Sequence, residues 1–172
     1  MMNEVIKCLL ERRSIRAFSD KRIPLDDLKL IAETARMAPS ARNQQKWKFT
    51  VVRNAELIGE LCSVIEKELY RPDYDKYNPD AIIIATAQTD YEFAKEDCAC
   101  ALENIFLAAH SLGIGSVWIN QLRGICDREA VRQVLTKLNI PSDHSAFGVA
   151  ALGYPAQEHR SISKLECIEI IS

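Results

Sequence analysis

The stretch of residues 101–119, ALENIFLAAHSLGIGSVWI, contains two hydrophobic patterns in succession. Its first part, ALENIFLAA, is apolar on nearly every side when wound as a helix, which indicates a helix enclosed by protein. Gly113 is typical of the position just beyond the last turn of a helix. The residues GSVWI then favour a strand. We therefore predict a helix over residues 93–112 and a strand over residues 115–119.

Further strands and helices are predicted on both sides of this unit. The run AIIIATA at residues 81–87 is continuously apolar and rich in β-branched side chains, which favours a strand buried on both faces. Two more strands are predicted at 47–52 and 146–153, and a final strand at 167–171 has no obvious mate. Helical spacing of apolar residues predicts helices over 3–12, from about 24 to before 39, 55–70, and 127–138 with Asp127 as cap.

The order of these elements favours an α+β fold with a sheet enclosed by helices. A chain of 172 residues is expected to form one domain, spanning 1–172, and 48% hydrophobic with 27% charged residues is ordinary for a globular protein. The net charge of -2 argues against a general nucleic-acid binder. No apolar run reaches transmembrane length and the first residues do not start a signal peptide, so we expect a cytoplasmic protein without membrane contact.

The six cysteines and three histidines have no spacing typical of a metal site, so no metal is predicted. We interpret the cysteines as reduced, packed thiols. A redox role for the closely spaced Cys98 and Cys100 is the alternative.

Residues 11–18, ERRSIRAF, concentrate three arginines and a serine in a chain with net negative charge. Arginine and serine side chains suit phosphate oxygens. The alternative is a solvated basic end of the first helix, where cations are favoured. The chain has no GxxxxGK[ST] loop, so a phosphate site made of side chains becomes the leading candidate. A second polar cluster, with Ser40, Asn43 and Gln45, suits the edge of a heterocycle or a polyol.

Taken in order, four segments resemble the FMN-dependent nitroreductase family. They are RRSIRAF at 12–18, APS at 38–40 followed by Asn43, Gln45 and Trp47, LEN at 102–104 running into LAAHSLGIGSVWI at 107–119, and ALGYPA at 151–156. The resemblance covers nearly the whole chain.

The resemblance implies a three-layer α/β/α sandwich with a mostly antiparallel central sheet. It also implies an intertwined homodimer with two FMN molecules at the subunit interface. The helix over residues 93–112 would then be a main dimer element, and the strand over residues 167–171 would reach across to the partner's sheet.

The resemblance also assigns roles to individual residues. Arg12, Arg13 and Ser14 would contact the FMN phosphate and ribityl chain, with Arg16 as a third basic group or a brace of the loop. Asn43 would face the pyrimidine edge of the flavin, with Ser40 and Gln45 nearby. Backbone groups of four residues would lie along the isoalloxazine: Gly115, Ser116, Val117 and Trp118. Arg160 would return to the phosphate, and Lys164 is the alternative for that role.

Lys46 stands where the family usually has proline. Its ammonium group either points to solvent, which we favour, or brings positive charge to the flavin, where it would favour reduction.

The activity implied is that of an FMN-dependent oxidoreductase. NAD(P)H would donate a hydride through flavin N5 to a nitroaromatic, a quinone or a similar acceptor, and no protein side chain is expected to be catalytic. The alternatives are a specialised relative, acting in dehalogenation, flavin destruction or ring oxidation, and a non-catalytic FMN-binding protein.

Overall fold

The computed structural model describes residues 3–72, 77–157, 164–165 and 167–171. Its centre is a four-stranded sheet in the order β1-β2-β4-β3, and every neighbouring pair is antiparallel. The strands are β1 (Trp47–Val52), β2 (Ala81–Gln88), β3 (Gly115–Ile119) and β4 (His144–Gly153). Because β1 and β3 are the outer strands, the chain segments that precede them lie at opposite edges of the sheet.

Strand β2 is buried on both faces, as its continuous apolar run predicts. Ile83 and Ala85 face one hydrophobic cluster, whereas Ile82 and Ile84 face another. This division follows from the period of two residues in a strand, which sends neighbouring side chains to opposite faces.

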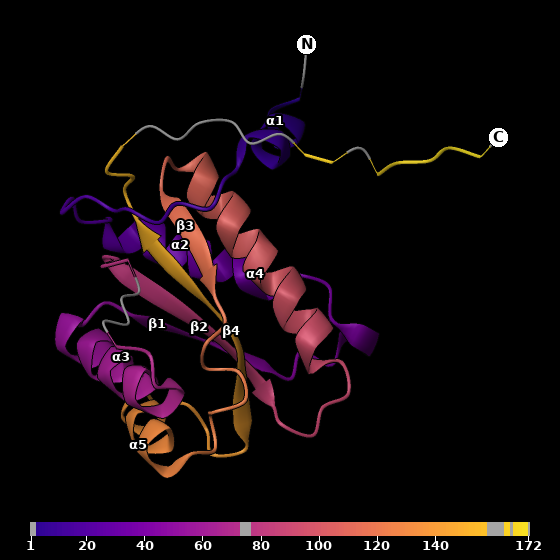
Figure 1. Ribbon diagram of the computed structural model, residues 1–172. Helices are drawn as coiled ribbons and strands as arrows, with labels where there is room; N and C mark the ends of the chain where they lie inside the picture. Colours follow the sequence, from indigo (N-terminus) through magenta and orange to yellow (C-terminus); the bar gives the residue numbers. More distant parts are fainter. Residues whose placement is uncertain (1–2, 73–76, 158–163, 166, 172) are drawn as a thin grey trace.

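Helices cover both faces of the sheet and give three layers (Figure 1). The cluster on one face includes residues of α2 (Leu25–Arg36) and α4 (Ala94–Ser111). The cluster on the other face includes residues of α3 (Ala55–Leu69) and α5 (Glu129–Lys137). The predicted α+β class and three-layer sandwich are confirmed. In the described part of the chain, no helix has the length and apolar character needed to cross a bilayer.

Helix α4 ends as its sequence predicts. Gly113 has a φ of 70°, a left-handed conformation that glycine adopts without strain. The amide of Ile114 donates to the carbonyl of Ala109 at 2.8 Å, and the amide of Gly113 donates to His110 at 2.9 Å. These bonds satisfy the last carbonyls of the helix and turn the chain directly into β3.

Three details differ from the sequence-based expectations. Helix α5 begins after Arg128 rather than after Asp127, and its N-cap makes no side-chain hydrogen bond. Helix α1 (Glu4–Glu11) has no buried residue, although its apolar residues follow helical spacing. Helix α4 is apolar toward the sheet but leaves Leu107 and Ala108 partly exposed, so one chain does not enclose it completely.

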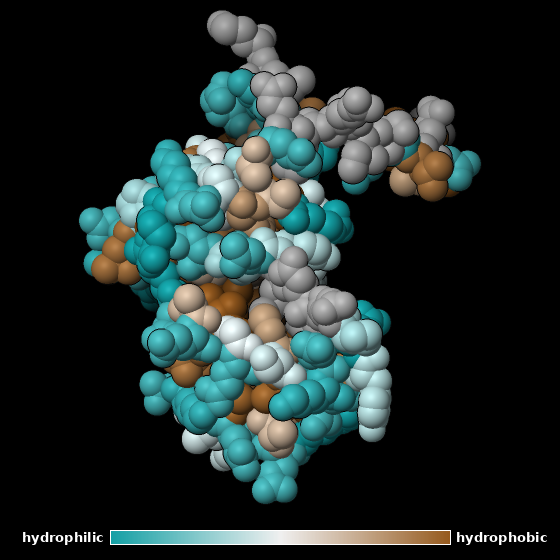
Figure 2. All heavy atoms as spheres, turned by 60° about the vertical axis from the view of Figure 1, so that its left-hand side comes forward, coloured by the Kyte–Doolittle hydropathy of each residue, from teal (hydrophilic) through white to brown (hydrophobic). Residues whose placement is uncertain are grey.

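The C-terminal segment forms no strand at residues 167–171 in this single chain. In Figure 1 the segment leads away from the sheet, and Figure 2 shows apolar side chains at its outer end. Leu165, Ile168, Ile170 and Ile171 are each at least 85% exposed. The pairing of this segment with the sheet of a second copy therefore stays a prediction.

Candidate functional site

Residues 12–16 lie beside the outer strand β3. The amide of Ile15 donates to the carbonyl of Ser116 at 2.9 Å, and Ser14 forms a parallel bridge with Ser116. Farther along, Phe18 bridges Pro155. Extended chain sends alternate side chains to opposite sides, which divides the residues of ERRSIRAF into two sets.

The first set, Arg12 and Ser14, lines a small hollow of ≈ 110 Å³ with Glu103, Phe106 and Trp118. The Arg12 guanidinium lies 5.9 Å from the centre of the Phe106 ring, and its Nε is 3.4 Å from a carboxylate oxygen of Glu103. That Nε is buried and, within the described residues, makes no hydrogen bond, although Glu103 is its ion-pair partner. Ser14 and Arg16 are exposed. A buried N–H of a cation that makes no hydrogen bond is a strong donor for an anion.

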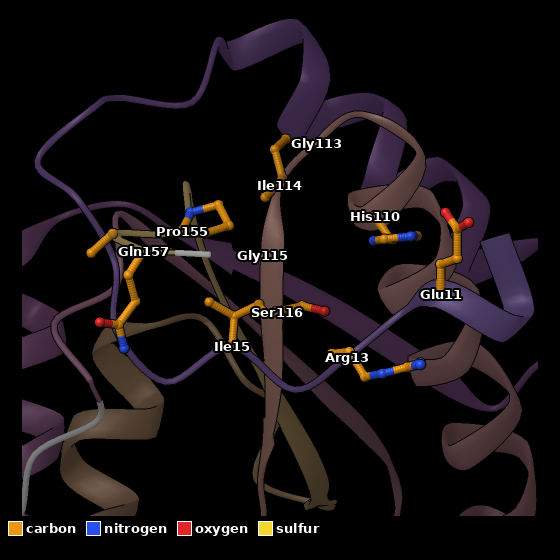
Figure 3. Close-up of a pocket in the computed structure, with 11 residues that line it drawn as sticks. Glu11, Arg13, Ile15, His110, Gly113, Ile114, Gly115, Ser116, Pro155 and Gln157 are labelled. Carbon is orange, nitrogen blue, oxygen red and sulfur yellow. The ribbon is translucent and has the colours of Figure 1, made fainter. Parts of the chain in front are cut away.

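The second set, Arg13 and Ile15, faces a larger cavity of ≈ 560 Å³ on the other side of the segment, with His110 and Pro155 on its wall. In Figure 3, Ile15 lies against β3 near Ser116, and Arg13 lies farther along the segment, on the side of Glu11 and His110. Nη1 of Arg13 donates to the carbonyls of Leu10 and Arg12, at 2.6 and 2.7 Å. Nη1 of Arg13 is therefore engaged with the end of α1, a position that favours a cation. The Nε of Arg13, like that of Arg12, is buried and makes no hydrogen bond within the described residues.

The predicted residues of β3 differ in what they can present to a ligand. Ser116 and Val117 are buried, and Val117 packs into the cluster under α3 and α5. Trp118 is 42% exposed, and its ring lies 5.9 Å from that of Phe106. Of these four residues, only Trp118 offers an exposed side chain, an indole beside Arg12.

The second predicted group lies in the turn η1 (Ala41–Asn43) and the residues around it. Gln45 donates through Nε2 to Oδ1 of Asn43 at 3.0 Å, and the amide of Gln45 donates to the Ser40 hydroxyl at 3.2 Å. Asn43 and Gln45 have φ values of 55° and 49°, and Arg42 has 54°. Left-handed backbone is uncommon outside glycine, and such residues concentrate at functional sites.

One chain does not bring these two groups together. Residues 40–46 lead into β1, whereas residues 12–16 accompany β3, and two strands lie between these edges. Three inter-strand spacings amount to about 14 Å. Helix α4 also shows that the two groups are far apart. The turn is hydrogen-bonded to Asp97 near the start of this helix, whereas Arg12 lies against Phe106 farther along it. Nine residues along a helix correspond to about 13.5 Å and a rotation of half a turn.

Three further basic residues of the sequence interpretation are Arg160, Lys164 and Lys46. Arg160 lies outside the described residues, and Lys164 is exposed. Lys46 is exposed, with its Nζ 5.5 Å from the centre of the Tyr91 ring.

The sequence interpretation missed Tyr91 and Asp97, which support the turn at Ala41. Asp97 is only 5% exposed although it is ionisable. The sequence feature that could have identified Asp97 is its position, because this acidic residue lies on the same helical face as Ala94 and Ala101 in an otherwise apolar stripe. Such an acid is costly to bury unless it has hydrogen-bond partners.

Cys98 and Cys100 have different surroundings, since Cys98 is buried and Cys100 is exposed. Burial, with a smaller contribution from the Asp97 charge, raises the pKa of Cys98 to about 12. Because the thiolate is the reactive form, Cys98 should not react with a thiol reagent at pH 8 in the native protein. Counting labelled thiols checks this prediction: Cys98→Ser should lower the count by one in denaturant and leave the native count unchanged. A lower native count would contradict it.

Arg12 and Ser14 present donors that suit an anionic group, and Asn43 and Gln45 present amide groups that suit the polar edge of a ring. Residues 9–154 match the model of the nitroreductase family, and the chain therefore belongs to that family. The predicted family is confirmed.

Relatives from three organisms support this membership. A protein of Archaeoglobus fulgidus, provisionally named NADH dehydrogenase/NAD(P)H nitroreductase, is 38% identical over 91% of this chain and 88% of its own length. The structure of a nitroreductase with bound FMN from Bacteroides fragilis superposes with a TM-score of 0.92, at 37% identity, covering 99% of this chain and 100% of the other. The FMN reductase [NAD(P)H] of Bacillus subtilis is 27% identical over 90% of this chain and 67% of its own length.

Proposed function

We propose that this chain is an FMN-dependent NAD(P)H oxidoreductase that reduces nitroaromatics, quinones or similar acceptors. FMN, when bound, would supply the hydride-transfer chemistry between the nicotinamide and the acceptor. The FMN bound to the Bacteroides fragilis relative and the NAD(P)H in the names of the other two support this cofactor and donor. The protein's part is to bind the cofactor, orient it and shield it from water.

The observation that carries the proposal is the buried Nε of Arg12. Among the described residues it makes no hydrogen bond, its ion-pair partner Glu103 lies at 3.4 Å, and the neighbouring Ser14 is exposed. A phosphate group would accept from both, and the charge-assisted bond to arginine would be the stronger of the two. Trp118 next to them offers an aromatic surface to a ring. These residues fit the phosphate and polyol end of FMN.

The ring end fits the turn at residues 40–45. Asn43 and Gln45 carry amide groups that both donate and accept hydrogen bonds, as the pyrimidine edge of a flavin requires. Their left-handed backbone presents them from an exposed turn rather than from a helix. In this role they orient the ring and hold no proton of the reaction.

The two ends would come from two copies of the chain, because in one copy they lie at opposite edges of the sheet. A homodimer with two-fold symmetry would use the same surface twice and form two identical sites. Exposed apolar residues provide surface for it, among them Val5 and Leu10 of α1 and the C-terminal Ile170. Helix α1 alone exposes four large apolar side chains, Val5, Ile6, Leu9 and Leu10, and such an accumulation is typical of an interface.

The function is tested by anaerobic reduction of the purified protein. We expect flavin absorbance that bleaches with NADH or NADPH and returns when a nitroaromatic or a quinone is added. A panel of acceptors that includes a halogenated tyrosine would reveal a specialised relative. Protein that takes up no FMN would refute the proposal, and bound flavin that no nicotinamide reduces would favour a non-catalytic FMN-binding protein.

A further inference from the structure

The turn at residues 40–45 has an uncommon backbone conformation. Three of its residues have left-handed φ angles, and none of the three is glycine. Within the turn, the amide of Asn43 donates to the carbonyl of Ser40 at 2.9 Å and that of Gln44 donates to Ala41 at 3.1 Å. Such a conformation persists only when the surrounding structure supports it.

Asp97 on α4 supplies that support at the start of the turn. Its carboxylate is buried, with 5% exposure, and Oδ1 accepts from the amide of Ala41 at 3.0 Å. Oδ2 accepts from the hydroxyl of Tyr91 at 2.7 Å. The carboxylate lies in the first turn of α4, where the helix dipole favours negative charge. The turn is therefore bound to a rigid helix through a charged acceptor.

Tyr91 fixes the orientation of that carboxylate. Its ring is 9% exposed, belongs to the core cluster under α2 and α4, and meets the Phe93 ring edge-on at 6.0 Å. Burial first, and then the hydrogen bond to Asp97, raises the pKa of Tyr91 to about 12. The hydroxyl thus keeps its proton at ordinary pH. It has only one proton, and the bond to Asp97 at 2.7 Å is shorter than the 3.4 Å contact with the Ala41 carbonyl.

We propose that Tyr91 and Asp97 are positioning residues that hold the turn in the shape in which Asn43 and Gln45 meet the flavin ring. This inference rests on the proposed function, since it specifies how the ring end of that site is built. The chain of contacts runs from the core through Tyr91 to Asp97, then to Ala41, and from there along the turn to the linked side chains of Asn43 and Gln45.

The test compares two ligands that have the same flavin ring and differ in the phosphate group. Full-length protein freed of flavin is titrated with FMN and with riboflavin, which has the same ring and no phosphate. Tyr91→Phe removes only the hydroxyl and should weaken both ligands by the same factor, about ten-fold, as expected for one lost hydrogen bond to a charged group. It should also alter the shape of the bound flavin's visible absorption band. Arg12→Ala should weaken FMN much more than riboflavin.

Matched variants separate positioning from general stability. Tyr70→Phe makes the same chemical change at a side chain that is 91% exposed, and should leave both affinities unchanged. Asp97→Asn should act like Tyr91→Phe, and combining the two should weaken binding by less than the product of the single effects, because both act through one network. Unfolding midpoints are recorded for every variant.

The results distinguish this inference from the proposed function. If wild-type protein binds FMN and Asn43→Ala weakens both flavins, but Tyr91→Phe and Asp97→Asn only lower the unfolding midpoint, the pair has a structural role and the inference is overturned. If wild-type protein binds neither flavin, the proposed function fails and the inference fails with it. An equal loss of FMN and riboflavin affinity in both variants, with the altered spectrum, supports it.

Discussion

Arg12→Ala should weaken FMN binding by about ten- to 150-fold, since a charge-assisted hydrogen bond contributes about 1.5–3 kcal/mol. The expected loss is large because the buried Arg12 Nε makes no hydrogen bond within the described part of the chain, and its ion-pair partner Glu103 lies at 3.4 Å. Fluorescence titration with FMN measures the effect. Arg36→Ala is the matched control, because Arg36 is exposed on α2 and forms an ion pair with Glu33 on the same helix.

Arg13→Ala should reduce the affinity for FMN less than Arg12→Ala does, and should reduce the stability of α1 more. Its guanidinium already donates to two carbonyls at the end of that helix. We therefore expect the double variant, Arg12→Ala with Arg13→Ala, to bind FMN about as weakly as Arg12→Ala alone while remaining folded. Full flavin occupancy in the purified double variant would show that this segment does not bind the phosphate.

Gly115→Val should both destabilise the protein and reduce FMN binding. A Cβ at Gly115 would lie 2.8 Å from Cγ2 and 2.9 Å from Cβ of Ile15, and Ile15 is buried and branched at Cβ. Residues 12–16 must then move off β3, which displaces Arg12 and Ser14. Overpacking of this kind costs about 1–3 kcal/mol. Urea denaturation and FMN titration measure the two effects.

Gly59 provides the control for this substitution. It lies in the middle of α3, and a Cβ there would meet nothing within 4 Å. Gly59→Ala should raise stability by about 0.5–1 kcal/mol and leave FMN binding unchanged. If Gly115→Val bound FMN as tightly as wild-type protein, the placement of Arg12 by β3 would be irrelevant to the site.

Local chemistry explains why most elements could be predicted from the sequence. Asn54 caps α3 by accepting from the amide of Leu57, Gly113 ends α4, and the apolar run of β2 fits only a doubly covered strand. The start of α5 differs by one residue, which is a detail of local capping. Apolar spacing in α1 and at residues 167–171 indicates burial, but the spacing does not say which surface provides the contact.

The sequence predicted which residue types form the candidate site, but it did not predict which direction each side chain faces. The motif identified Arg12, Arg13 and Ser14 together, but alternation along extended chain separates Arg13 from the other two. Val117 belongs to the motif although its side chain faces the core. The role of Asp97 was not predictable because its partner, the Ala41 amide, is a backbone group 56 residues away. Tyr91 is connected to the turn mainly through its hydrogen bond to Asp97.

The central claim, a flavin site shared by two copies of the chain, is tested most directly by mixing two inactive variants. One carries Arg12→Ala with Ser14→Ala, the other Asn43→Ala with Gln45→Ala. Each is expected to lose flavin and reductase activity at limiting FMN. After unfolding and refolding together in equal amounts, half of the dimers should be mixed. Each mixed dimer then has one intact site, which restores about a quarter of wild-type activity. No recovery in the mixture, with both variants folded and dimeric, would contradict the account.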